Sequence, residues 1–240
     1  TVKLQIHRGL LGYDGQGNLR SELAETWEAE DARTYRFNLR RNAVFHDGTP
    51  VTSADVKASM DAIRAPDSTA FLRGAFGIID SIETPDDHTV RVSLTGASAS
   101  FIYLMASFHF YVVSAASLEA DPDNLVGCGP YTIVSSERGT RIDLKAFPQF
   151  YKEGLPKTEN LSFVAYKDEN LRVAALEAGD VDIIEYVPWQ AMDQVESNGN
   201  LALDTTDGPF MYLIFNVTQG PFANSKVRDA VGYAIKREDV

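Results

Sequence analysis

The clearest pattern in the chain is an alternation of apolar and polar side chains over residues 35–40. Tyr35, Phe37 and Leu39 are apolar, and a polar residue follows each of them. This period of two is typical of a strand that buries one face. The pair Asp47-Gly48 then predicts a turn, because glycine tolerates the positive φ that such a bend requires.

A second pattern, with helical spacing, follows directly. Thr52 or Ser53 supplies the N-cap, and Asp55 lies where the helix dipole favours a negative charge. Apolar side chains at positions 56, 60 and 63 fall on one face. The sequence therefore predicts an amphipathic helix over about residues 53–64.

Up to residue 150 the remaining chain is dominated by short strands and turns. Gly12 to Gly17 has the composition of a hairpin turn. A short helical segment is expected at 71–76. The other predicted elements are a strand hairpin at 78–83 and 89–94, helices at 100–106 and 114–120, and strands at 110–113, 131–137 and 140–147.

From Leu161 onward, predicted strands alternate with predicted helices. Strands are expected at 161–166, 181–184, 201–205 and 211–216. Helices are expected at 169–178, where Gly179 provides the C-terminal stop, at 189–196 and from 226 to the last residue. This alternation favours a parallel or mixed sheet.

Several blocks of residues also resemble one known family. In chain order they are TYRFNLRRNAVFHDGTPVTSADVKASM with the preceding Leu23–Trp27, then Gly127–Tyr131, Phe150-Tyr151, Leu176–Asp182, Phe215-Asn216, Pro221-Phe222 and Val227–Val231. Together they are similar to the family 5 extracellular solute-binding proteins. Members of this family are the peptide-, dipeptide- and nickel-binding components of bacterial ABC importers.

The resemblance implies a fold and a domain arrangement. The fold class is α/β (mixed α+β), similar to the type II periplasmic binding proteins. Residues 1–11 and 151–240 would form part of a mixed α/β first domain, and residues 12–150 an inserted, β-rich second domain. Family members are longer at both ends, so we expect a fragment whose second lobe would follow residue 240.

The same resemblance implies a function. The chain would capture a small ligand, with a short peptide as the first candidate, between two lobes that close by a hinge, and would deliver it to ABC permease subunits. Alternatives are a nickel chelate, a sugar, or a sensory or chaperone-like role without transport. No enzymatic activity and no cofactor are expected. The implied location is the periplasm or the extracellular face of the cytoplasmic membrane.

The resemblance also points to residues near a ligand cleft. The cluster Phe108-His109 with Tyr111 corresponds to a part of the family fold that borders the cleft. The alternative is a core strand with one exposed imidazole. The full set of candidate ligand-binding residues is Phe71, Arg73, Phe108, His109, Tyr111, Met211, Tyr212 and Asn216.

Composition excludes some classes of function. The net charge of −12 at pH 7 argues against nucleic acid, whose phosphates require a basic surface. The longest apolar runs are far shorter than the roughly 20 residues that span a bilayer. The single cysteine, Cys128, excludes an internal disulfide, and we interpret it as a small buried side chain.

Catalytic and metal-binding patterns are weak throughout. The four histidines lie far apart in the sequence and lack ligand spacing. His46 is interpreted as structural. Gly127-Cys-Gly129 lacks the third glycine of a dinucleotide-binding loop. Asp180, Asp182 and Glu185 could form a carboxylate pair, but we expect a structural strand there.

Overall fold

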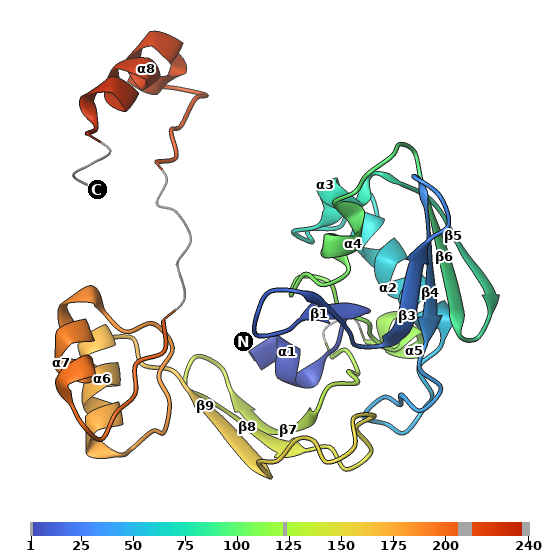
Figure 1. Ribbon diagram of the computed structural model, residues 1–240, viewed down its shortest axis with the longest axis horizontal. Helices are drawn as coiled ribbons and strands as arrows, with labels where there is room; N and C mark the ends of the chain where they lie inside the picture. Colours follow the sequence, from blue (N-terminus) through green and yellow to red (C-terminus); the bar gives the residue numbers. More distant parts are fainter. Residues whose placement is uncertain (1, 122–123, 206–212, 237–240) are drawn as a thin grey trace. The chain divides into compact units, whose positions relative to one another are not determined.

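The structure is a computed structural model that describes residues 2–121, 124–205 and 213–236 (Figure 1). Candidate residues Met211 and Tyr212 lie outside the described residues. The chain divides into two compact units, Thr1–Lys167 and Asp168–Val240, and each is described by itself. Among the described residues, no helix is long and apolar enough to cross a bilayer.

The first unit contains most of the regular structure. Its helices are α1 (Val2–Ile6), α2 (Ser53–Arg64), α3 (Arg73–Phe76), α4 (Phe101–Leu104) and α5 (Ala115–Ala120). Its strands are β1 (Leu11–Tyr13), β2 (Leu19–Ser21), β3 (Ala24–Ala29), β4 (Thr34–Leu39), β5 (Ile79–Asp86), β6 (Thr89–Leu94), β7 (Tyr131–Glu137), β8 (Arg141–Ala146) and β9 (Asn160–Val164).

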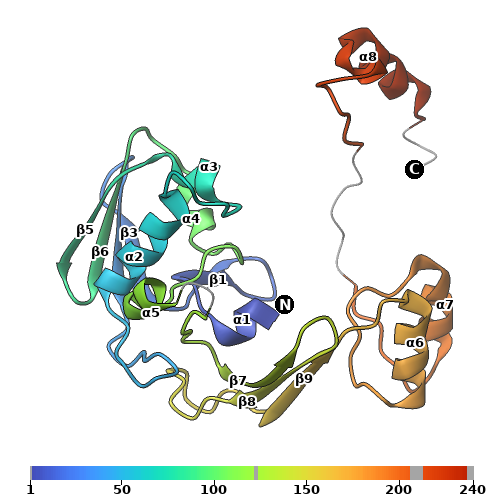
Figure 2. The same cartoon turned by 180° about the vertical axis from the view of Figure 1, so that it is seen from behind.

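A four-stranded antiparallel sheet in the order β3-β4-β6-β5 forms the larger layer of this unit (Figures 1 and 2). The central strand β4 places Phe37 opposite Val90 of β6 and opposite Trp27 of β3. The alternation predicted for residues 35–40 is confirmed, since Tyr35, Phe37 and Leu39 are buried. The predicted hairpin of β5 and β6 is also confirmed.

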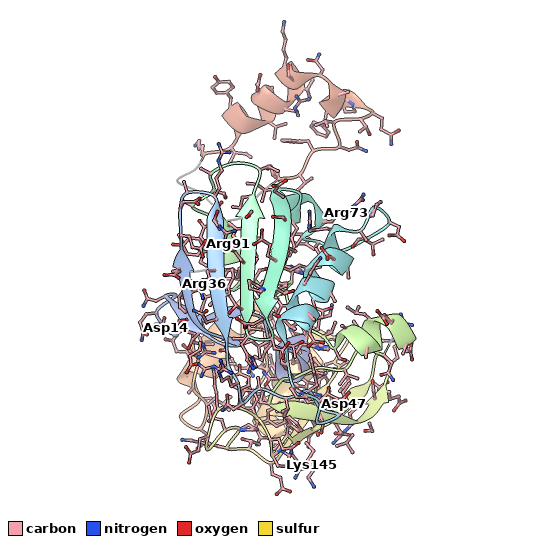
Figure 3. The ribbon with its side chains drawn as sticks, turned by 90° about the vertical axis from the view of Figure 1, so that its right-hand side faces the viewer. Asp14, Arg36, Asp47, Arg73, Arg91 and Lys145 are labelled. Carbon is pink, nitrogen blue, oxygen red and sulfur yellow. The ribbon has the colours of Figure 1, made fainter. Side chains whose placement is uncertain are left out.

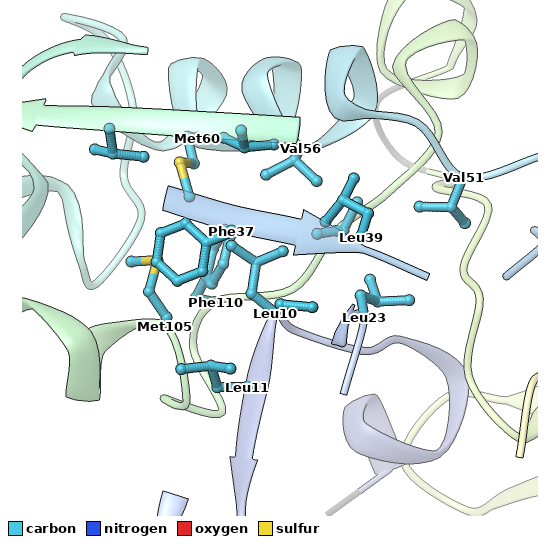
Figure 4. Close-up of a cluster of buried hydrophobic side chains, with 14 of the residues drawn as sticks. Leu10, Leu11, Leu23, Phe37, Leu39, Val51, Val56, Met60, Met105 and Phe110 are labelled. Atoms are coloured by element: carbon cyan, nitrogen blue, oxygen red, sulfur yellow. The ribbon is translucent and has the colours of Figure 1, made fainter. Parts of the chain in front are cut away.

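The buried face of this sheet packs against α2 and against the chain around Met105 and Phe110 (Figure 4). Phe37, Val56 and Met60 are fully excluded from solvent within this core. The opposite face carries charged side chains. There Arg91 bridges Glu30 at 2.7 Å and Glu83 at 3.3 Å, and Arg36 lies on the same face (Figure 3).

The start of α2 is fixed by the capping residues that the sequence indicates. Thr52 is the N-cap, and its backbone N–H and hydroxyl both donate to Asp55, at 2.8 and 2.7 Å. The other carboxylate oxygen of Asp55 accepts the backbone N–H of Ala115, 2.9 Å away, at the start of α5. One buried carboxylate thereby joins the first turns of two helices.

The second sheet of the unit contains three antiparallel strands in the order β7-β8-β9. Leu144 of β8 lies opposite Leu161 of β9, so the chain pairs across the predicted domain boundary at residues 150 and 151. That boundary falls inside the first compact unit, which runs to Lys167. The assignment of residues 12–150 to an inserted domain therefore stays a prediction.

Gly127 and Gly129 allow the chain to pass against α1. A Cβ on Gly127 would lie 2.2 Å from the carbonyl oxygen of Ile6, and one on Gly129 would lie 2.5 Å from that of Gln5. Gly129 also donates its N–H to Ile6 at 2.7 Å. The Gly-Cys-Gly sequence is therefore required for close backbone packing.

The second unit is built from short helices. They are α6 (Glu169–Ala178), η1 (Trp189–Ala191), α7 (Met192–Ser197), η2 (Pro221–Ala223) and α8 (Ser225–Ala234). Asp168 caps α6 by accepting the N–H groups of Asn170 and Leu171, at 2.8 and 3.3 Å. Gly179 ends it with a positive φ of 77°, as the sequence predicts.

Several predicted strands do not form. Residues 181–184, 201–205 and 213–216 have no strand pairing, and residues 110–113 make only a single bridge, from Val112 to Arg8. All the described strand pairs are antiparallel, so the parallel or mixed sheet expected after Leu161 is not seen. A strand is stable only beside another strand, and the described residues offer these segments none.

Candidate ligand-binding site

Partly exposed and buried side chains alternate along the segment from His109 to Val112. Phe110 and Val112 are buried, at 1% and 0% exposure. The N–H of Val112 donates to the carbonyl of Arg8 at 2.9 Å. This anchoring leaves His109 and Tyr111 at the edge of the unit, where neither is fully buried.

Phe71 is placed by a similar arrangement just before α3. The neighbouring Leu72 and Phe76 enter the core, and Phe76 packs on Phe110 with ring centroids 5.5 Å apart. Phe71 itself is 78% exposed. The Phe76–Phe110 pair therefore joins the two segments in the core. Each segment also carries aromatic side chains that face outward.

Those outward rings form a stack centred on His109. The imidazole lies 4.2 Å from the Phe71 ring at an interplanar angle of 23°, and 4.0 Å from the Phe108 ring at 36°. Phe108 is 61% exposed. We call Phe71, Phe108 and His109 the aromatic stack. The sequence comparison grouped these three residues, and the structure brings them together.

Tyr111 belongs to the adjoining surface. Its ring stacks on His7 at 4.7 Å and 25°, and the ammonium of Lys3 lies 5.5 Å from its centroid. His109 and Tyr111 also line a hollow of about 170 Å³, whose other walls come from α2, α5 and the loops beside them. Apart from Ser59 and the aromatic edge, the side chains that line the hollow are apolar.

His7 is the most perturbed titratable group beside this surface. Burial lowers the pKa of His7 to about 4, and the nearby charges of His46 and Lys3 act in the same direction. Burial also lowers the pKa of His46, although its contact with the Gly129 carbonyl at 3.0 Å opposes the shift. The imidazole that stacks on the Tyr111 ring, His7, is therefore neutral at pH 7.

Arg73 and Asn216 are the other candidate residues that the structure describes. Arg73 is the first residue of α3 and is exposed (Figure 3). Asn216 lies in the second unit, where its side-chain oxygen accepts the N–H and hydroxyl of Thr218 at 3.1 and 2.7 Å. That geometry is a local turn, and the role of Asn216 in ligand binding stays a prediction.

The second unit contains two aromatic residues that the sequence comparison missed. Tyr186 has a φ of 63°, which is rare for a residue with a side chain, and it is 81% exposed. Arg172 holds this conformation by donating to the Tyr186 carbonyl at 2.7 Å. Trp189 is 83% exposed at the start of η1. Strained backbone positions such as Tyr186 are concentrated at functional sites.

Cys128 does not contribute a nucleophile. It is fully buried, and burial raises the pKa of its thiol to about 12. A thiol with such a pKa is almost entirely protonated at pH 7. The aromatic stack itself offers ring faces and an imidazole, which are groups that bind flat, cationic or carboxylate-bearing molecules without covalent chemistry.

A sequence profile for the family described as bacterial extracellular solute-binding proteins, family 5 Middle, matches residues 18–240. The glutathione-binding protein GsiB of Pectobacterium atrosepticum is 31% identical over 99% of this chain and 48% of its own length. The chain therefore spans about half the length of the relatives that it matches.

Solved structures agree with this match. The binding protein AgaA from A. tumefaciens R10, in complex with agropinic acid, is 42% identical with a TM-score of 0.91, over 98% of this chain and 49% of that one. MoaA from the same source, in complex with mannopinic acid, is 27% identical with a TM-score of 0.85, over 100% and 51%. The chain belongs to the family 5 bacterial extracellular solute-binding proteins.

Proposed function

We propose that the chain is the ligand-capturing half of an ABC importer's solute-binding protein, located in the periplasm or on the extracellular face of the membrane. The observation that carries the site is the aromatic stack, because Phe71 and Phe108 expose most of their rings although they adjoin a packed core. Exposed aromatic rings in contact with one another are a common feature of surfaces that meet a partner.

The hollow beside the stack supports a site shared with a second lobe. Pockets for small ligands usually enclose about 300–1,000 Å³. The hollow lined by His109 and Tyr111 has about 170 Å³, so it would provide only one wall of such a pocket. Closure of a hinge over the aromatic stack would complete the enclosure without any covalent step.

A short peptide is the first proposed ligand. Peptide groups and terminal charges are bound by hydrogen bonds and ring faces, and His109 adds a polar nitrogen at the centre of the stack. A nickel chelate, a sugar, or a sensory or chaperone-like role stays an alternative. A bacterial strain that lacks the protein should lose uptake of the ligand if transport is the role.

Agropinic acid is the second candidate, and one observation favours it. AgaA was solved with agropinic acid and shares 42% of its residues with this chain across 98% of the chain. Glutathione is a further candidate, because the relative GsiB is a glutathione-binding protein. Calorimetric titration of the protein at its natural length with short peptides, glutathione and agropinic acid separates these candidates directly.

Substitution of His109 tests where the ligand binds. His109→Ala should weaken binding at least tenfold and leave the melting temperature of the unliganded protein nearly unchanged. Tyr13→Ala removes an exposed ring from β1, outside the stack, and serves as the matched control. If His109→Ala melts many degrees lower and binds normally, His109 is a structural residue and the proposed site is wrong.

A further inference from the structure

A buried carboxylate in the first unit is surrounded by more positive charge than it needs. Glu22 is 3% exposed, and Lys152 approaches it at 2.7 Å and Arg20 at 3.0 Å. The hydroxyl of Tyr151 donates to the same carboxylate at 2.7 Å. These contacts satisfy both carboxylate oxygens, and they hold the pKa of Glu22 below its usual value although burial acts against them.

Arg8 is the additional cation. Its Nε lies 3.8 Å from the Glu22 carboxylate, beyond hydrogen-bond distance, and among the described residues this buried nitrogen has no hydrogen-bond partner. Only its Nη1 has a described bond, to the Leu4 carbonyl. A guanidinium carries five N–H donors, so Arg8 retains donors that Glu22 does not use.

The spare donors border a hollow. Arg8, Arg20, Lys152 and Lys157 all line a cavity of about 370 Å³, and Phe150 and Leu155 contribute apolar walls. None of the described residues that line the hollow is acidic, and the buried Glu22 contacts two of the four cations, Arg20 and Lys152. The chain as a whole carries a net charge of −12, so this concentration of positive charge runs against its composition.

We propose that this hollow binds an anion, namely the carboxylate or phosphate group of a small solute. Two arginines and two lysines converge on one space, and guanidinium groups match the planar or tetrahedral oxygens of such anions. The residues differ from those of the aromatic stack, so this inference does not depend on the proposed transport function.

The cluster has a simpler structural explanation, which is that the cations only hold Glu22 in place. Lys152, Arg20 and Tyr151 suffice for that purpose. Arg8 lies 3.8 Å from Glu22 and its guanidinium is 5.8 Å from the centroid of the Phe150 ring, yet its buried Nε has no hydrogen-bond partner among the described residues. A buried polar group without a hydrogen bond has a desolvation cost that the structural role leaves unexplained. An anion in the hollow would supply the missing partner.

Titration with two probes tests the proposal. The protein at its natural length is titrated with inorganic phosphate and, separately, with succinate, at constant ionic strength set by chloride. Both the heat of binding and the melting temperature are followed. We expect a saturable rise in melting temperature with at least one probe. The stronger probe identifies the favoured anion, phosphate or carboxylate.

Variants locate the binding. Arg8→Gln should raise the Kd of the bound probe at least tenfold, because a charge-assisted hydrogen bond is lost. Arg20→Gln, at a half-exposed position on the same hollow, should weaken binding in the same direction and guards against misfolding of the first variant. Arg36→Gln removes the same charge from the outer face of β4 and should leave the Kd unchanged.

Two outcomes would overturn the inference. The first is that neither probe produces a saturable effect. That result is expected if an acidic side chain from elsewhere in the protein already fills the hollow. Alternatively, Arg36→Gln could weaken binding as much as Arg8→Gln and Arg20→Gln, which would show general screening of charge.

Discussion

The two compact units differ in how their structure is stabilised. The first has a continuous core, with Phe37, Phe76 and Phe110 buried among strands and helices. The second has a small cluster centred on Val173, Ala191 and Val195, while several large apolar side chains are exposed. Packing between residues far apart in the sequence therefore stabilises the first unit. The structure of the second unit depends more on interactions between neighbouring residues.

This difference explains which elements form. Helices close their hydrogen bonds within one segment, so α6 forms between its Asp168 cap and the Gly179 stop without a neighbouring sheet. Strands need a partner, and residues 181–184 have none among the described residues. The exposed Ile183 and Trp189 of the second unit are surfaces that a partner could cover.

The largest expected effect is a core truncation in the first unit. Phe37→Ala should lower the free energy of unfolding of that unit by about 3–5 kcal/mol, because it leaves a cavity in the centre of the sheet. The core of the second unit shares no residue with it. Hydrogen exchange by mass spectrometry should show faster exchange in β4 and β6 and unchanged exchange in α6. Equal acceleration in α6 would show that the units unfold together.

The next effect is a loss of stability in mild acid that is confined to the first unit. Its cause is His7, whose pKa is about 4 in the folded protein against an ordinary value of 6.5. Between these values the unfolded chain binds the proton first, so stability falls as the pH decreases. The loss from His7 should be about 2 kcal/mol at pH 5 and about 3 kcal/mol below pH 4. Residues 168–240 contain no histidine.

Denaturant unfolding at pH 7 and pH 5 measures the loss of unfolding free energy that His7 causes. His7→Gln should reduce the difference between the two pH values by about 2 kcal/mol, whereas His88→Gln leaves His7 in place and should retain it. His46, whose pKa is also lowered, contributes with the same sign. The carboxylate of Glu22 acts at lower pH, since its contribution to stability is lost as the pH falls from the ordinary glutamate pKa through the lower pKa of the folded state. An unchanged difference in His7→Gln would contradict the assignment.

Sequence reasoning succeeded where the signal is local. The alternation at 35–40, the cap at Thr52 and the stop at Gly179 each depend on a few neighbouring residues, and all three are confirmed. The strands predicted at 181–184 and 201–205 were wrong, because an apolar run does not indicate whether a pairing strand is available.

The candidate sites were predictable to different degrees. The aromatic stack could be predicted because Phe108 and His109 are adjacent and the family resemblance supplied Phe71. Tyr186 could not be predicted, because its unusual φ is a property of the backbone that the residue type does not indicate. The basic hollow was also missed, since Arg8, Arg20 and Lys152 come from segments far apart in the sequence.

A smaller effect concerns the helix that begins the second unit. Asp168→Ala should destabilise α6 by about 1 kcal/mol, because the N–H groups of Asn170 and Leu171 lose their acceptor. Asp168→Asn retains a side-chain oxygen and should recover most of the loss. Hydrogen exchange of α6 reports the change, and exchange in β4 should not respond. A response in β4 would show that the cap also stabilises the first unit.

The smallest expected effect on stability is at Phe71. Here we compare two positions of one segment. Phe71→Ala and Phe76→Ala make the same chemical change five residues apart. Phe76 is fully buried, so its truncation should lower the free energy of unfolding by about 3–5 kcal/mol. Phe71 is 78% exposed, so its truncation should change stability by no more than about 0.5 kcal/mol.

Ligand binding should give the reverse order. The Phe71 ring covers one face of His109, and its loss would remove contact area from the proposed site and release the imidazole from its stacked position. We expect Phe71→Ala to weaken binding about tenfold in the protein at its natural length, measured by calorimetry below the melting temperature of each variant. A Phe71→Leu variant should restore part of the apolar contact without the ring face. If Phe71→Ala binds normally, the stack is a surface feature unrelated to the ligand, and the search for the site moves to Tyr186 and Trp189 in the second unit.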